Sequence, residues 1–307
     1  MAKKHAIDDK PDAPLFESTG AHELVARDVT QTFLDGDAEV WALDRFSLSV
    51  KGAEIVGIIG PSGCGKSTFL RMLAGLDTPL SGTITFDGKP IEGPDRTRAM
   101  VFQNANLFEW LTVEENIAFG LKAVKEYDEK SYKIPRLVKM MGLEGFEDSY
   151  PPQISGGMAS RCGLARTFVM NPGLICFDEP LSALDAFTRS ALQDEIVKMQ
   201  QLAHMSMVIV THDIEEAVYL CDRVVVMSAR PGRFVGELAI DLPHPRNRVS
   251  PEFVEKRSQL LDLLHHGGPL TEFEEYRAAR EGGGAQNAGA GEDGGGDASA
   301  PAGKERA

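Results

Sequence analysis

Short apolar runs alternate with amphipathic stretches through the central part of the chain. The apolar runs cover residues 54–59, 174–177, 207–210 and 223–227. This alternation is typical of parallel strands joined by helices. It predicts an α/β fold with a mainly parallel central sheet.

A second, smaller sheet is predicted near the N-terminus. Residues 23–33 and 46–50 have strand patterns and precede the first apolar run. Residues 83–89 predict a β-hairpin, because Asp87-Gly88 supplies the positive φ angles that a tight turn needs. We expect these segments to form an N-terminal antiparallel β subdomain.

The middle of the chain has a different pattern. Residues 112–124, 134–141 and 159–170 have the apolar spacing of helices, and no buried-strand run interrupts residues 104–155. The pattern predicts a helical insertion at about residues 104–170, inside the α/β domain.

Both ends of the chain predict little fixed structure. Residues 1–22 are polar with two prolines, and residues 281–307 contain no large apolar side chain whose burial could offset the entropy of ordering. A Ser250-Pro251 pair predicts the start of a capped helix. The expected division is a flexible segment at 1–22, a main domain at 23–240, a C-terminal helical extension at 241–280 and a disordered Gly/Ala-rich tail at 281–307.

Charge and composition exclude several classes of protein. The 307 residues carry a formal net charge of -14, which argues against binding to nucleic acid or to an anionic lipid surface. No apolar run approaches the roughly 18 residues of a membrane span, and no secretory signal follows the first lysines. The cysteines at positions 64, 162, 176 and 221 lack metal or redox spacing. They predict reduced thiols in a cytosolic protein.

A glycine-rich turn follows the first apolar run and precedes a helical pattern at 69–76. It consists of Gly60, Pro61, Ser62, Gly63, Cys64, Gly65, Lys66, Ser67 and Thr68. This is the P-loop pattern with its required flanks, in which backbone N–H groups surround phosphates. Lys66 would reach the terminal phosphates, and the Ser67 hydroxyl would bind Mg²⁺. The turn predicts a P-loop NTPase core.

Two further apolar runs end in polar side chains. Asp178 and Glu179 follow residues 174–177, and His212 follows residues 207–210. Because ligands bind beyond the carboxyl ends of parallel strands, these groups should meet the P-loop. Asp178 would hold Mg²⁺, Glu179 would polarise the attacking water and His212 would contact the γ-phosphate. Alternatively, Asp178-Glu179 is an acidic surface turn and His212 is structural.

A second glycine turn, Ser155-Gly156-Gly157, opens a helical pattern upstream of Asp178. It could be a second anion cradle at a helix N-terminus, or an ordinary N-cap. One nucleotide needs only one cradle. The first interpretation therefore predicts that two chains pair, each lending its second cradle to the nucleotide of the other.

These motifs, in this order, resemble the nucleotide-binding subunits of ATP-binding-cassette transporters, over about residues 23–235. The resemblance implies that residues 60–68 are the Walker A segment, residues 174–179 the Walker B strand with its catalytic glutamate, and His212 the switch histidine. Residues 154–158 resemble the signature sequence, although Ile154 and Met158 replace the family's leucine and glutamine.

The resemblance also assigns residues that spacing alone does not. Gln103 falls at the Q-loop position, which senses the metal and contacts the membrane partner. Asp185 ends the D-loop Ser182-Ala183-Leu184-Asp185 between the two sites of a pair. Phe33 falls where the family stacks an aromatic ring on adenine, with Trp41 as an alternative.

The resemblance implies partners as well: a second ATP-binding subunit, a separate membrane permease and, indirectly, a periplasmic solute-binding protein. Residues 107–111 are candidates for the permease groove, or else Phe108 and Trp110 belong to the core of the insertion. The runs at 155–158, 228–233 and 250–253 resemble importers of nitrate, sulfonates and taurine. The expected place is the cytoplasmic face of the inner membrane. The alternatives are a soluble cassette ATPase without transport and a P-loop small-molecule kinase.

Overall fold

The central sheet of the computed structural model has six strands. The structure describes residues 13–17, 21–36, 38–182 and 184–266. The strand order is β10-β9-β3-β8-β7-β6. The members are β3 (Ile55–Ile59), β6 (Arg98–Val101), β7 (Leu174–Asp178), β8 (Ser206–Thr211), β9 (Arg223–Met227) and β10 (Phe234–Ala239). All pairings are parallel except that of β9 with β10, so the mainly parallel sheet is confirmed.

A second, antiparallel sheet has the order β2-β1-β4-β5. Its strands are β1 (Glu23–Asp35), β2 (Ala38–Lys51), β4 (Ser81–Phe86) and β5 (Lys89–Pro90). The predicted hairpin is present, with φ of 51° at Asp87 and 73° at Gly88. β2 starts eight residues before the predicted strand at 46. The prediction missed this first half because it is largely exposed and lacks an apolar alternation.

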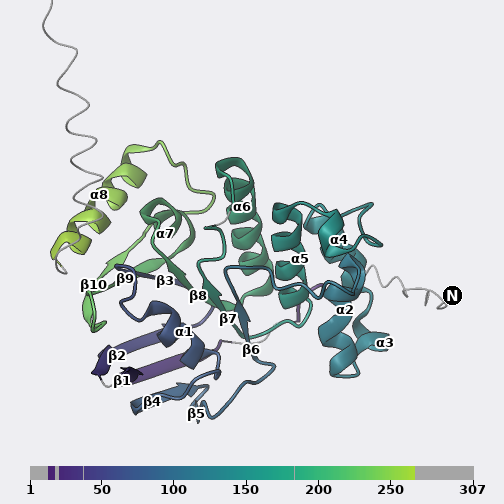
Figure 1. The fold of residues 1–307 in the computed structure, drawn as a ribbon. Coiled ribbons are helices and arrows are strands. Elements are labelled where there is room, and N and C mark those ends of the chain that lie inside the picture. The colour runs from purple at the N-terminus through teal and green to yellow at the C-terminus, as the bar shows by residue number, and fades with distance from the viewer. Residues whose placement is uncertain (1–12, 18–20, 37, 183, 267–307) are drawn as a thin grey trace, which may run out of the picture. The chain divides into compact units, whose positions relative to one another are not determined.

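Helix α1 (Lys66–Leu73) lies between the two sheets (Figure 1). Its Phe69 ring packs edge-on against Phe46 of β2, with the centroids 4.8 Å apart. Both rings are fully buried in a core that also includes residues of β3, β7 and β8. This core anchors the start of α1, and therefore the P-loop before it, between two rigid layers.

The segment between β6 and β7 is helical, as predicted. It contains α2 (Val113–Ala123), α3 (Tyr127–Lys130), α4 (Lys133–Met140), the 3₁₀ turn η1 (Pro151–Gln153) and α5 (Gly156–Phe168). Thr112 caps α2 in a reciprocal box with Glu115. These helices lie beyond the β6 edge of the central sheet (Figure 1).

On the face of the central sheet away from α1 lie α6 (Ala186–Ala203) and α7 (Ile214–Leu220) (Figure 1). Helix α8 (Pro251–His266) is capped by Ser250, whose Oγ accepts from the Phe253 N–H at 3.3 Å. It packs on α7, β9 and β10. Residues 267–307, which include the predicted tail, lie outside the described residues. Within the described ranges, no helix combines the length and the apolar character needed to cross a membrane.

Part of the N-terminal segment that was expected to be flexible packs on the helical insertion. Leu15 and Phe16 are each only 9% exposed, and the Phe16 ring packs against Phe168 of α5. Arg136 donates to the Ala13 carbonyl oxygen at 2.6 Å, which fixes the backbone before this pair. Two apolar residues are too few to show a helical or strand period in the sequence, but the structure buries both against the helical insertion. Residues 1–12 and 18–20 lie outside the described residues.

All four cysteines are free and buried. Burial raises the pKa of the Cys162 and Cys176 thiols to about 12 each.

Candidate functional site

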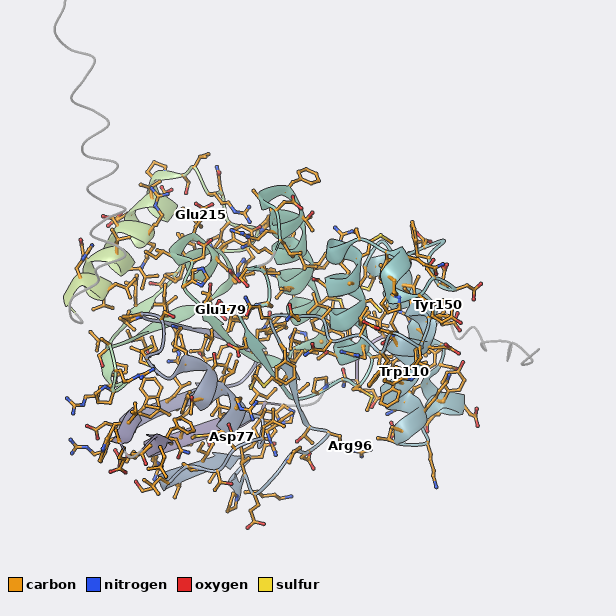
Figure 2. All side chains as sticks on the ribbon, viewed as in Figure 1. Asp77, Arg96, Trp110, Tyr150, Glu179 and Glu215 are labelled. Atoms are coloured by element: carbon orange, nitrogen blue, oxygen red, sulfur yellow. The ribbon has the colours of Figure 1, made fainter. Side chains whose placement is uncertain are left out.

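Three strand ends bring the predicted groups together. β3, β8 and β7 are parallel neighbours, so the P-loop after β3, His212 after β8 and Glu179 after β7 share one edge of the sheet. Figure 2 shows Glu179 in the middle of the molecule, between the α1 and α6 sides of the sheet. The arrangement follows directly from the strand order.

The P-loop backbone needs glycine at two positions. Gly63 and Gly65 have φ of 73° and 99°, in the region that side chains other than glycine rarely adopt. A Cβ at Gly65 would also lie 2.7 Å from the carbonyl oxygen of Ala42. Gly65 is the N-cap of α1, so the loop turns directly into a helix N-terminus. Such a terminus carries unpaired N–H groups and a partial positive charge, which suits a phosphate.

Lys66 is a buried cation with neutral neighbours. Its side chain is 6% exposed, and Nζ donates to the carbonyl oxygens of Gly60 at 2.7 Å and Pro61 at 2.8 Å. Among the described residues no carboxylate forms an ion pair with it. Burying an ammonium without a counter-charge costs free energy, and binding of an anion would offset that cost.

Ser67 and Asp178 form an oxygen pair at the foot of the loop. The Ser67 hydroxyl donates to the Asp178 carboxylate at 2.8 Å. Burial raises the pKa of Asp178 above its ordinary value, and the Ser67 hydrogen bond opposes that shift. A hydroxyl and a carboxylate are ligands that Mg²⁺ accepts, together with phosphate oxygens and water.

Glu179 is held from two sides. Nδ1 of His212 lies 3.2 Å from its carboxylate. On the other side, Gln103 Nε2 donates to the Ser182 hydroxyl at 3.0 Å, and that hydroxyl donates to the Glu179 carbonyl oxygen at 2.9 Å. Glu179 has φ of 47°, an uncommon backbone conformation for a residue with a side chain. The structure therefore links Gln103 to Glu179 through Ser182, which the sequence indicated only as part of the D-loop.

A pocket of about 360 Å³ opens over the P-loop. It is lined by Phe33, Val40, Ala42, Ser62, Gly63, Gly65, Lys66, Ser67, Thr68, Glu179 and Arg230. Phe33 lines it and Trp41 does not, because Trp41 follows Val40 and alternate residues of β2 face opposite sides. Sequence reasoning missed Val40, Ala42 and Arg230. Only Arg230 carried a signal, as a cation just after β9 at the same sheet edge.

The second glycine turn lies outside this pocket. Ser155 caps α5, its Oγ accepting from the Met158 N–H at 3.2 Å. Asp185 caps α6, accepting from the N–H groups of Phe187 and Thr188 at 3.1 and 3.0 Å, and these bonds lower its pKa. A Cβ at Gly156 would meet nothing within 4 Å, whereas one at Gly157 would lie 2.7 Å from the Thr188 side chain, so the turn is open at Gly156. One chain therefore brings together the P-loop groups, but not Ser155, Gly156, Gly157 or Asp185.

Comparison with known proteins identifies relatives of this arrangement. Residues 43–182 match the ABC transporter domain family. The chain is 46% identical over 244 residues to an uncharacterized ABC transporter ATP-binding protein of Methanocaldococcus jannaschii, covering 79% of this chain and 91% of the relative. It is 42% identical over 241 residues to the aliphatic sulfonates import ATP-binding protein SsuB of Bacillus anthracis, covering 78% of this chain and 95% of SsuB.

A solved structure gives the same result. A dimeric ATP-binding cassette in a post-hydrolysis state, bound to ADP and Pi, superposes with a TM-score of 0.63 at 30% identity, over 72% of this chain and all of that chain. The sequence resemblance to transporter cassettes is thus confirmed, and the kinase alternative loses its basis. These relatives show that the chain belongs to the ABC transporter family, as an ATP-binding subunit that hydrolyses ATP.

Proposed function

We propose that this chain is the ATP-hydrolysing subunit of an importer for a small anionic or zwitterionic solute of the nitrate, sulfonate or taurine kind. It would work as a pair of copies, on the cytoplasmic face of the inner membrane, beneath a separate permease. A periplasmic solute-binding protein would deliver the solute. The observation that carries the proposal is one sheet edge that joins the P-loop, Asp178, Glu179 and His212, in a chain 42% identical to a sulfonate importer subunit.

The pocket over the P-loop is the site we assign to ATP. The Phe33 ring is 46% exposed and lines the pocket, so it is free to stack on the adenine base. The N–H groups of residues 60–68 would surround the phosphates. Lys66 would exchange its bonds to the Gly60 and Pro61 carbonyl oxygens for bonds to the terminal phosphates, which are stronger because both partners are charged.

The residues present suit a Mg²⁺ ion that arrives with the nucleotide. No group of three His, Cys, Asp or Glu side chains within the described ranges could hold a metal alone. Ser67 and Asp178 supply two oxygens, and Gln103 lies on the Glu179 side of the site. These three residues would hold Mg²⁺ only together with phosphate oxygens and water. Bound there, the ion would neutralise charge on the terminal phosphates.

Glu179 and His212 are assigned to hydrolysis. The Glu179 carboxylate lines the pocket, where it would accept a hydrogen bond from the attacking water and draw away its proton. His212 already touches this carboxylate and is 61% exposed, so its ring is free to turn toward a γ-phosphate.

The pairing of two copies is supported by the open second glycine turn. Ser155, Gly156 and Gly157 form a helix N-terminus that is remote from the pocket of their own chain. In a pair, this turn would close on the γ-phosphate in the other copy, with Asp185 next to the interface. The dimeric state of the similar cassette bound to ADP and Pi supports the pairing of two copies.

The permease would dock on the helical insertion. Trp110 is 72% exposed, which weighs against its being core, and its ring contacts Phe108, with the centroids 5.3 Å apart. Phe108 in turn packs on Phe119 at 4.4 Å, so the insertion provides a base for an exposed aromatic surface. Figure 2 shows Trp110 on the helical side of the molecule, away from Glu179. A permease helix that contacts Trp110 would lie seven residues along the chain from Gln103.

The experiment is reconstitution. The full chain is purified together with a permease chosen from the proteins encoded near it, and the complex is placed in proteoliposomes with a solute-binding protein chosen in the same way. We expect MgATP-dependent uptake of at least one labelled alkanesulfonate, taurine or nitrate. Phosphate release without an added acceptor, but with no association with any permease and no uptake, would leave an ATPase and refute the importer.

A further inference from the structure

The turn between β9 and β10 forms one wall of the P-loop pocket. The Gly232 N–H donates to the Ala42 carbonyl oxygen at 2.8 Å, and the Gly232 carbonyl oxygen accepts from the Asp44 N–H at 3.1 Å. A Cβ on Gly232 would collide with the carbonyl oxygen of Cys64. The turn therefore lies between β2 and the P-loop, and its backbone at Gly232 is so close to the P-loop backbone that no side chain would fit between them.

The shape of the turn is fixed from inside. The Ser228 hydroxyl donates to the Pro231 carbonyl oxygen at 2.9 Å and accepts from the Arg233 N–H at 3.0 Å. The Ser228 N–H donates to the Arg233 carbonyl oxygen at 3.0 Å. A turn held in this way presents its side chains in set directions, so Arg230 and Arg233 are positioned rather than loose.

The two arginines of the turn have different surroundings. Arg233 pairs with the Asp44 carboxylate at 2.6 Å and does not line the pocket. Arg230 lines the pocket, and its Nε donates to the Gly63 carbonyl oxygen at 3.1 Å. Its Nη2 lies 3.0 Å from where a Cβ of Gly63 would be. Among the described residues no carboxylate pairs with Arg230.

A guanidinium held against a phosphate loop without a counter-ion has a clear chemical use. Within the described part of the chain only its Nε is engaged, so the Nη groups keep donors that can meet phosphate oxygens in a fork geometry. Of the described side chains, Arg230 and Lys66 are the two cations that line the pocket. We propose that Arg230 is a second cationic contact to the phosphate chain of the bound nucleotide, supplied by the β9–β10 turn. This inference rests on the proposed ATP site at the P-loop.

The test compares Arg230→Gln, Arg230→Lys and the control Arg233→Gln, which removes the same charge from the same turn. The full-length proteins are titrated with MgATP, and inorganic tripolyphosphate is used as a competitor that has only the phosphate chain. We expect Arg230→Gln to weaken both ligands about tenfold or more, the usual size for hydrogen bonds to charged groups. Arg230→Lys should recover part of the affinity, because it keeps the charge but not the fork geometry, and Arg233→Gln should keep nearly all of it. In steady-state hydrolysis, KM for ATP should rise with kcat little changed.

Several results would overturn the proposal. Wild-type affinity in Arg230→Gln would do so, and so would an equal loss in Arg233→Gln, which would point to net charge or to the turn itself. A loss for MgATP but not for tripolyphosphate would move Arg230 to the ribose or base. A loss in Arg230→Lys as large as in Arg230→Gln would reduce Arg230 to a support of Gly63. If the wild-type protein bound no MgATP, the proposed function would fail instead.

Discussion

Nδ1 of His212 lies 3.2 Å from Oε2 of Glu179, across the gap between the ends of β8 and β7. The two residues are 33 positions apart in the sequence, and only the parallel pairing of their strands joins them. A carboxylate held by an imidazole beside a phosphate loop has the geometry of a base for water.

Replacing Glu179 by glutamine should separate nucleotide binding from turnover. The amide keeps the size of the side chain but cannot take a proton from water. We expect MgATP affinity close to wild type and a hydrolysis rate lower by about 10²–10⁴, the usual contribution of a positioned base. Titration calorimetry and phosphate release measure the two quantities. Glu144→Gln, at an exposed site in the helical insertion, is the control. Unchanged turnover in Glu179→Gln would remove this residue from the mechanism.

Glu216 should make stability depend on pH. Its carboxyl is buried in α7, and this burial raises its pKa from about 4.5 to about 7. Repulsion from Asp213 and Glu179 adds to the rise, whereas the Thr211 hydrogen bond and the charge of Arg189 oppose it. Because the folded state then holds this proton to higher pH than the unfolded state, the contribution to stability is full below pH 4.5. It is lost as the pH rises to about 7, by an amount of the order of 3 kcal/mol.

Glu216→Gln should abolish this dependence. The variant keeps a neutral side chain at every pH, so its free energy of unfolding should exceed that of the wild type at pH 8 and approach it near pH 5. Urea unfolding across this range measures the difference. Parallel pH profiles for the two proteins would show that Glu216 ionises in the folded state at its ordinary pKa.

Much of this site was predictable, because its residues follow local rules. Strand ends gave Asp178, Glu179 and His212, since an apolar run that stops at a polar residue needs no tertiary information. The positions of Arg230 and Ser182 required the structure, because each is set by a hydrogen bond to a distant segment, Arg230 to Gly63 and Ser182 to Gln103.

The elements that escaped prediction are those whose burial is set by neighbours. β10 is an edge strand with largely exposed or half-exposed residues, so it lacks an apolar run. Leu15 and Phe16 form a pair too short to have a period, yet both are covered. In contrast, the apolar spacing predicted α2 to within a residue or two, and the structure adds the capping box of Thr112 and Glu115 at its start.

Trp110→Ala should weaken association with the permease while the fold is preserved. The ring is 72% exposed, so its removal leaves almost no cavity, and thermal unfolding should be unchanged. Pull-down of the permease from co-expressing cells should show a clear loss. Phe234→Ala, which removes an exposed aromatic ring from β10, is the matched control. Full assembly and coupled transport in Trp110→Ala would count against this docking surface.

Gly156 offers the sharpest test of pairing. A Cβ there meets nothing within 4 Å, so aspartate and asparagine should both fit in the isolated chain. Aspartate also suits the first turn of a helix, so α5 should remain stable.

If this turn closes on the γ-phosphate of the other copy, only the negative charge of aspartate should prevent pairing. In a Glu179→Gln background with MgATP, we expect dimers for the parent and for Gly156→Asn, and monomers for Gly156→Asp. Light scattering after size exclusion measures the mass. Dimers in all three proteins would remove this turn from the interface, and monomers for both Gly156 variants would show that bulk, not charge, decides.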